Sequence, residues 1–121
     1  MFSLSSSLQY YLYARPTDMR KSFDGLCGIV TTHLEQDPTS GAVFLFLNRR
    51  RDRIKLLVWD RNGFWILYKR LEQGRFQFPV ADAGKKEIQL SYETIIMLLE
   101  GIDLNTIKRR KRYIKKHKQL A

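Results

Sequence analysis

The chain has 121 residues, 44% of them hydrophobic, with seven Phe, six Tyr and two Trp; this suffices for one domain with a core and excludes a two-domain enzyme. The formal net charge is +10, most of it from residues 108–118, which contain Lys and Arg but no Asp or Glu. This distribution indicates nucleic acid or another polyanion as a partner, and the alternative is a tail that only keeps the protein soluble. No segment reaches the roughly 18 apolar residues of a membrane span, and the N-terminus has no basic signal-peptide region. We therefore expect a cytoplasmic protein.

A strand and a helix are expected first along the chain. The apolar and aromatic run Leu8–Tyr13 predicts a strand. A helix is expected from Met19 to about Glu35, because its apolar residues recur at steps of three and four. These residues are Met19, Phe23, Leu26, Ile29, Val30 and Leu34. Thr17 or Asp18 is the expected N-cap, and Gly25 and Gly28 are expected to let the helix lie close to a sheet.

The centre of the chain predicts an antiparallel β-meander. Three runs rich in Val, Ile, Phe, Trp and Tyr fit half-buried strands: Ala42–Leu47, Ile54–Trp59 and Phe64–Leu71. Two polar links join them, Asn48–Arg53 and Asp60–Gly63. The second link ends in Asn-Gly, a pair that tolerates the positive φ of tight hairpins. The first link carries arginines around a single acid and gives the meander a basic tip.

The last third of the chain predicts two more strands and a short helix. Arg75–Phe78 and Glu87–Leu90 alternate polar and apolar residues as strands do. Ser91 is the expected cap of a helix over Tyr92–Glu100. The whole pattern predicts an α+β fold: an antiparallel β-meander with one long helix packed on the sheet, a short C-terminal helix and a basic C-terminal tail. Residues 1–104 are expected to form a single domain and residues 105–121 the tail.

The sequence contains none of the common signatures of catalysis or cofactor binding. It has no P-loop and no dinucleotide-binding fingerprint. His33 and His117 are far apart, and neither has a neighbour at metal-ligand spacing. Asp24, Asp52 and Asp60 fall on a helix, a hairpin tip and a turn, where acids have structural roles. We therefore expect no catalytic residues, no metal and no cofactor.

Basic residues at the turns and in the tail are the candidate nucleic-acid site, because the guanidinium fork of arginine binds phosphate in a bidentate manner. An alternative is that the hairpin arginines only solvate the tip, with Asp52 and Asp60 as partners. The residues expected to contact nucleic acid are Arg49, Arg50, Arg51, Arg53, Arg61, Lys69, Arg70, Lys108, Arg109, Arg110, Lys111, Arg112, Lys115, Lys116 and Lys118.

Several strings in the chain resemble a known family. They are PTDMRKSFDGL (residues 16–26), FLNRRRDRIK (46–55), WD (59–60) and YKRLEQG (68–74). In this order they resemble the small accessory proteins, called TnpB or Orf2, of bacterial insertion sequences of family sixty-six. The resemblance covers roughly residues 8 to 104. It implies a protein that is needed for transposition and acts beside a large transposase, which is taken to carry the cutting and joining chemistry.

The resemblance also draws attention to the polar residues of the first string. Arg20, Lys21 and Asp24 lie off the expected apolar face of the helix, so we treat them as candidate interaction residues. The alternative is a local ion pair, since Arg20 and Asp24 are four residues apart. Our first hypothesis is a DNA-binding accessory subunit of a transposition complex without catalysis of its own. The alternative is a protein-protein module that bridges or regulates the transposase. The sequence carries no indication of oligomeric state.

Overall fold

The structure is a computed structural model that describes residues 3–78, 84–100, 102–103 and 108–109. Its main sheet has five strands in the order β4-β3-β2-β1-β5, and two very short strands, β6 and β7, pair with each other. The elements in chain order are β1 (Tyr10–Tyr13), α1 (Phe23–Thr32), β2 (Val43–Leu47), β3 (Arg53–Asp60), β4 (Gly63–Arg70), β5 (Glu87–Leu90), α2 (Tyr92–Glu100), β6 (Ile102–Asp103) and β7 (Lys108–Arg109).

The predicted meander is confirmed and is extended by two further strands. Strands β2, β3 and β4 pair antiparallel in sequence order. Strand β1 pairs parallel with β2, with Tyr10 opposite Val43, and antiparallel with β5. Helix α1 is the connection between the two parallel strands, as a parallel pair requires. The fold is therefore α+β with a mostly antiparallel sheet.

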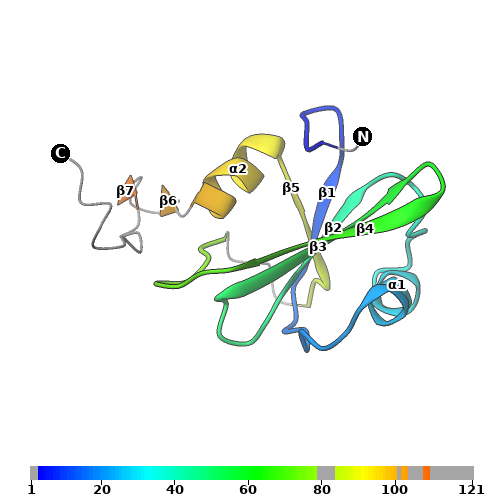
Figure 1. Cartoon of the computed structure of the whole chain (residues 1–121), viewed down its shortest axis with the longest axis horizontal. Coiled ribbons are helices and arrows are strands. Elements are labelled where there is room, and N and C mark those ends of the chain that lie inside the picture. The colour runs from blue at the N-terminus through cyan, green and yellow to red at the C-terminus, as the bar shows by residue number, and fades with distance from the viewer. Residues whose placement is uncertain (1–2, 79–83, 101, 104–107, 110–121) are drawn as a thin grey trace.

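Both faces of the sheet are covered, α1 on one side and α2 on the other (Figure 1). The core under α1 consists of buried side chains from the helix and the sheet: Leu26, Ile29, Val30, Phe44, Phe46 and Leu57. The core under α2 likewise consists of buried side chains from the helix and the sheet: Leu12, Val43, Leu45, Leu56, Ile95 and Leu98. Strand β2 is buried at every position because it lies in the middle of the sheet with both faces covered.

Helix α1 is shorter than predicted. It begins at Phe23 rather than Met19, with Ser22 as N-cap and no side-chain capping bond. The preceding residues form a turn instead, in which the Lys21 N–H donates to the Asp18 carbonyl. The helix ends before Glu35, which has a left-handed φ of 53°. The expectation of one long helix is not confirmed.

The predicted inner face of this helix is wrong at Phe23. The expectation that its two glycines let the helix lie close to the sheet is also wrong. Leu26 and Val30 are buried, but Phe23 is 44% exposed. A Cβ on Gly28 would meet nothing within 4 Å, so this glycine does not mark a close approach to the sheet. A Cβ on Gly25 would lie 3.1 Å from the Cβ of Lys21, so the neighbour of Gly25 is the preceding turn.

Two details, one after the central strands and one between two of them, also differ from expectation. Residues 75–78 are not a strand: the Phe76 N–H donates to the Arg51 carbonyl, and the chain crosses the hairpin tip with Phe76 buried. In the turn between β3 and β4 the positive φ falls on Arg61 (63°) rather than on Asn62 or Gly63.

Strand β5 and helix α2 are confirmed, and the Ser91 hydroxyl oxygen accepts the Thr94 N–H as a cap does.

Candidate nucleic-acid interface

The hairpin tip between β2 and β3 is held by one asparagine. The Asn48 side-chain oxygen accepts the N–H groups of Asp52 and Arg53, both at 3.0 Å. Its amide nitrogen donates to the Asp52 carboxylate at 2.7 Å, and this bond is the main reason that the pKa of Asp52 is lowered. The acid of the tip is therefore hydrogen-bonded within the loop itself, and the charges of Arg50 and Arg53 lower its pKa further.

The segment after β4 fastens the tip from the side. The Leu71 N–H donates to the Asp52 carbonyl, and the Phe76 N–H donates to the Arg51 carbonyl, both at 2.7 Å. Arg51 has a left-handed φ of 61°. Its guanidinium lies 4.6 Å from the centre of the Phe78 ring, a cation–π contact that fixes the side chain. The tip thus presents its cations from an ordered backbone.

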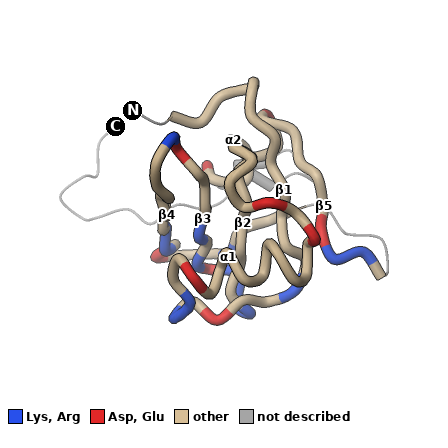
Figure 2. The backbone as a smooth tube through the Cα atoms, turned by 90° about the vertical axis from the view of Figure 1, so that its right-hand side faces the viewer, with Lys and Arg blue, Asp and Glu red and all other residues tan. Residues whose placement is uncertain are grey.

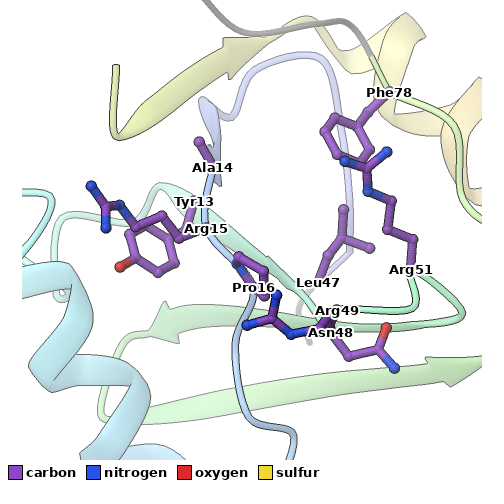
Figure 3. A pocket seen from close by; sticks show the side chains of 9 residues that line it. All are labelled: Tyr13, Ala14, Arg15, Pro16, Leu47, Asn48, Arg49, Arg51 and Phe78. Atoms are coloured by element: carbon purple, nitrogen blue, oxygen red, sulfur yellow. The ribbon is translucent and has the colours of Figure 1, made fainter. Parts of the chain in front are cut away.

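A further arginine reaches the tip from the end of β1. Because β1 and β2 are parallel, their carboxyl ends lie together, and Arg15 follows β1 as Arg49 follows β2. The two arginines and Arg51 line one cavity of about 200 Å³ (Figure 3). The other lining residues are Tyr13, Ala14, Pro16, Leu47, Asn48 and Phe78. The carboxyl ends of parallel strands are common ligand sites, and this one offers three guanidinium groups.

A pair of arginines from two neighbouring strands lies beside this cavity. Arg53 and Arg70 are directly opposite each other on β3 and β4. Like charges in this position repel each other, so an anion between them stabilises the arrangement. Glu72 forms an ion pair with one of the two arginines: the Arg70 Nε donates to its carboxylate at 2.8 Å. Together with Tyr68 these residues line an open depression of about 460 Å³.

All five strands of the main sheet have a cation at the same end. Arg15 and Arg49 follow β1 and β2, Arg53 begins β3, Arg70 ends β4, and Lys86 precedes β5. The Lys86 carbonyl accepts the Ala14 N–H at 2.8 Å, which places it beside the end of β1. We call this surface the basic end (Figure 2). It consists of Arg15, Arg49, Arg50, Arg51, Arg53, Arg70 and Lys86.

The structure separates two predicted residues from this surface. Arg61 lies in the turn between β3 and β4, at the opposite end of the sheet. Lys69 faces α2, and its Nζ donates to the Leu99 carbonyl at 2.8 Å, near the end of that helix. Arg15 and Lys86 were missed by sequence reasoning, because only the pairing of β1 with β2 and β5 brings them to the tip.

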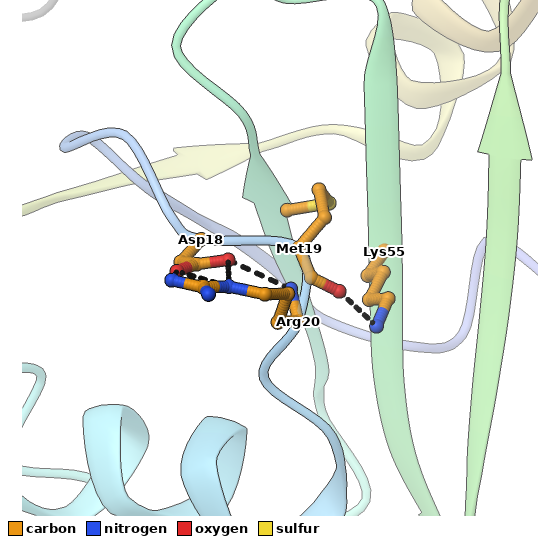
Figure 4. A network of polar contacts seen from close by, with 4 residues as sticks. All are labelled: Asp18, Met19, Arg20 and Lys55. Carbon is orange, nitrogen blue, oxygen red and sulfur yellow. Dashed lines mark hydrogen bonds and ion pairs between the residues drawn. The ribbon is translucent and has the colours of Figure 1, made fainter.

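The polar residues of the first string form their own contacts next to this end. Arg20 pairs with Asp18 and not with Asp24: its Nη2 donates to the Asp18 carboxylate at 2.6 Å (Figure 4). The hydrogen bonds from Arg20 lower the pKa of Asp18 to about 2. Asp24 is exposed in the first turn of α1, where its negative charge stabilises the positive end of the helix dipole. Lys21 is exposed.

A buried lysine, missed by sequence reasoning, positions this turn. Lys55 on β3 is 8% exposed. Its Nζ donates to the carbonyls of Met19 and Lys21, both at 2.8 Å, and lies 4.8 Å from the centre of the Tyr68 ring. These two carbonyls are taken by the lysine, so the segment turns where a helix was predicted.

The remaining candidate residues lie toward the C-terminus. Lys108 and Arg109 form β7, opposite β6. The other tail cations lie outside the described residues: Arg110, Lys111, Arg112, Lys115, Lys116 and Lys118. Within the described ranges no group of His, Cys, Asp and Glu is placed to hold a metal ion. In that same part of the chain no helix is long and apolar enough to cross a bilayer.

Comparison with known proteins decides the family. The sequence matches the IS66 Orf2-like proteins over residues 8–109. The chain belongs to this family. The resemblance seen in the sequence is thereby confirmed, and it connects the protein to the transposition of an insertion sequence as an accessory protein.

Two relatives come from Sinorhizobium fredii (strain NBRC 101917 / NGR234), and both are described as uncharacterized proteins. The first, y4jC, is 33% identical over 110 residues, which cover 91% of this chain and 92% of y4jC. The second, y4hO, is 34% identical over 106 residues, which cover 85% of this chain and 88% of y4hO. No solved structure matches the chain.

Proposed function

We propose that this IS66 Orf2-like protein is a non-catalytic accessory protein of transposition that binds DNA phosphates through its basic end and its C-terminal tail, in a complex with the transposase of the same element. One observation carries the proposal: every strand of the main sheet has a Lys or Arg at the same end. Such a surface is suited to a polyanion, because its cations are gathered at one end of the sheet.

The arginines of this surface are suited to phosphate rather than to base edges. Arg15, Arg49 and Arg51 line one cavity, and each guanidinium group can donate to phosphate in a bidentate manner. Arg53 and Arg70 form a second position next to it. Phosphate contacts hold DNA without reading its sequence. The surface therefore supplies affinity, and the choice of the element ends falls to the transposase.

The tail adds a second group of phosphate contacts. Its sequence between residues 108 and 118 contains basic residues and no acid. Cations that contact phosphate gain affinity by releasing the counterions of DNA. In the proposed complex the basic end and the tail contact the same DNA.

The first experiment measures the affinity of the pure protein for element ends and for random DNA, with and without residues 110–121. The deletion keeps β7 and its pairing with β6. We expect weaker binding to both DNAs to a similar degree, and a log–log salt slope smaller by roughly four to five units, at about 0.9 per phosphate contact. A pull-down of the transposase is the parallel readout. Loss of the transposase with unchanged DNA affinity would contradict the proposal and support the bridging module.

A further inference from the structure

Strand β4 is the outer strand of the main sheet, and no described strand pairs with its free edge. An exposed strand edge is a template for another strand, and soluble proteins usually protect it with charges, Pro, bulges or short length. Strand β4 has eight residues, and its stretch Gly63–Tyr68 contains no charge and no Pro. The opposite outer strand, β5, has only four residues, among them Glu87 and Gln89.

The apolar side chains of this edge are exposed on both faces of the sheet. Trp65 is 50% exposed and Leu67 38% on the α2 face, and Tyr68 is 51% exposed on the α1 face. Trp65 and Leu67 are neighbours on one face of this strand, and Tyr68 lies on the other face. A run of this kind marks an interaction surface.

The hydrogen-bonding groups of β4 that point outward follow from its register with β3. Asp60 and Gly63 face each other across the two-residue turn, and the Leu71 N–H donates to the Asp52 carbonyl. Hydrogen-bonded pairs alternate along an antiparallel ladder, so the odd-numbered residues of β4 bond to β3. The N–H and C=O groups of the even-numbered residues Phe64, Ile66 and Tyr68 therefore point to the free edge.

We propose that the free edge of β4 pairs antiparallel with β4 of a second copy of this chain, with the two-fold axis at Ile66. In this register Trp65 lies opposite Leu67 of the partner on one face, and Phe64 lies opposite Tyr68 of the partner on the other. Each aromatic side chain then gains an apolar cross-strand neighbour. Phe64, Ile66 and Tyr68 supply the outward N–H and C=O groups that join the two strands.

Charge favours a second copy over the basic tail of the same chain. A basic segment on this edge meets Lys69 and Arg70, which repel it. In the two-fold register, Lys69 and Arg70 of one copy lie opposite the uncharged Gly63 and Asn62 of the other. The uncharged stretches meet each other in the middle of the pairing.

The size of the surface sets the expected strength. Half of a Trp and half of a Tyr side chain correspond to roughly 100 Å² each. With Leu67 and the backbone, the pairing buries roughly 500–800 Å² in total, less than the about 1,200 Å² of a stable interface. The expected dimer is therefore weak and depends on concentration. Its two basic ends lie at opposite ends of the joined sheet, so one dimer can hold two DNA segments.

The test is sedimentation equilibrium of the full-length protein, treated with nuclease, in a dilution series. The wild type is expected to shift from the monomer mass of 14.4 kDa toward twice that mass as its concentration rises. The double variant Trp65→Lys and Leu67→Lys brings four lysines together at the two-fold axis, and it should raise the dissociation constant more than tenfold. Gln89→Lys, which adds one lysine at an exposed position on the other outer strand, should leave it unchanged. A cooperative thermal transition of each variant shows that it is folded.

Hydrogen exchange of the Ile66 and Tyr68 amides distinguishes the possible occupants of the edge. Protection that disappears on dilution supports the dimer. Protection in a monomer assigns the edge to another segment of the chain and overturns the proposal. A wild type that stays monomeric, a dimer that survives the double variant, or capture of the transposase by the β4 edge of a monomer also overturns it.

Discussion

Lys55 of β3 donates from Nζ to the backbone carbonyl of Met19 at 2.8 Å, although 36 residues separate the two in sequence. The same Nζ donates to the Lys21 carbonyl. This buried lysine joins the sheet to the turn that carries Asp18 and Arg20, and it determines where α1 begins.

Replacing Lys55 with Met should therefore destabilise the fold. The variant keeps the apolar stem but leaves two carbonyls without their charged donor, so we expect the free energy of unfolding to fall by about 1.5–3 kcal/mol. Chemical denaturation measures it. Lys69→Met is the control, because Lys69 is exposed and donates to one carbonyl, and its loss should cost less than about 1 kcal/mol. Equal losses in both variants would refute the structural role of Lys55.

The inner face of α1 is tested by two matched substitutions. Leu26 is fully buried, and Leu26→Asp places an unpaired charge in the core, so the variant should not fold. Phe23 lies on the same predicted stripe but is exposed, and Phe23→Asp should change the free energy of unfolding by no more than about 0.5 kcal/mol. Circular dichroism melting curves measure both. A soluble Leu26→Asp variant with a cooperative transition would show that the helix packs by another face.

The hairpin tip should depend on Asn48. Its side chain makes three hydrogen bonds within the loop, and Asn48→Ala leaves the partly buried groups of Asp52 and Arg53 without partners. We expect a loss of about 1–3 kcal/mol in the free energy of unfolding, together with weaker DNA binding. Asn62→Ala, in the exposed turn at the other end of the sheet, is the control. An undiminished stability of Asn48→Ala would mean that the segment after β4 suffices to hold the tip.

The pairing of Asp18 with Arg20 can be read from a titration. The pKa of Asp18 is lowered from its ordinary 3.8 to about 2, so its contribution to stability is complete above pH 3.8 and is lost as the pH falls through 2. In Arg20→Ala the pKa should rise toward 3.8, without reaching it while the backbone N–H of residue 20 still donates. The carboxyl carbon signal in NMR reports the titration. An unchanged pKa would show that the ion pair does not form in solution.

Local patterns in the sequence predicted much of the fold. The alternation and turn residues of the centre gave β2, β3 and β4, and Ser91 gave the start of α2. The parallel pairing of β1 with β2 was not predicted, because a strand of four residues carries no signal about its partner. The start of α1 was predicted wrongly, because the periodicity of its apolar residues contains no information about Lys55.

The candidate site was predicted in the same partial way. The arginines of the tip are contiguous in sequence and were found. Arg15 and Lys86 reach the same surface through the sheet topology, and a prediction of the β1–α1–β2 unit would have pointed to Arg15, which follows the first parallel strand. Lys69 was assigned to DNA because it is next to Arg70, but neighbouring residues of a strand face opposite sides of the sheet.

The most direct test of the account compares the salt dependence of DNA binding for three single variants. Arg15→Ser and Arg49→Ser each remove one cation from the basic end, and Arg61→Ser removes one exposed cation from the opposite end of the sheet. At one pH, on random duplex DNA, the log–log salt slope should fall by about one unit in each of the first two variants and stay unchanged in the third. Equal slopes in all three variants and the wild type would contradict the claim that the basic end binds DNA.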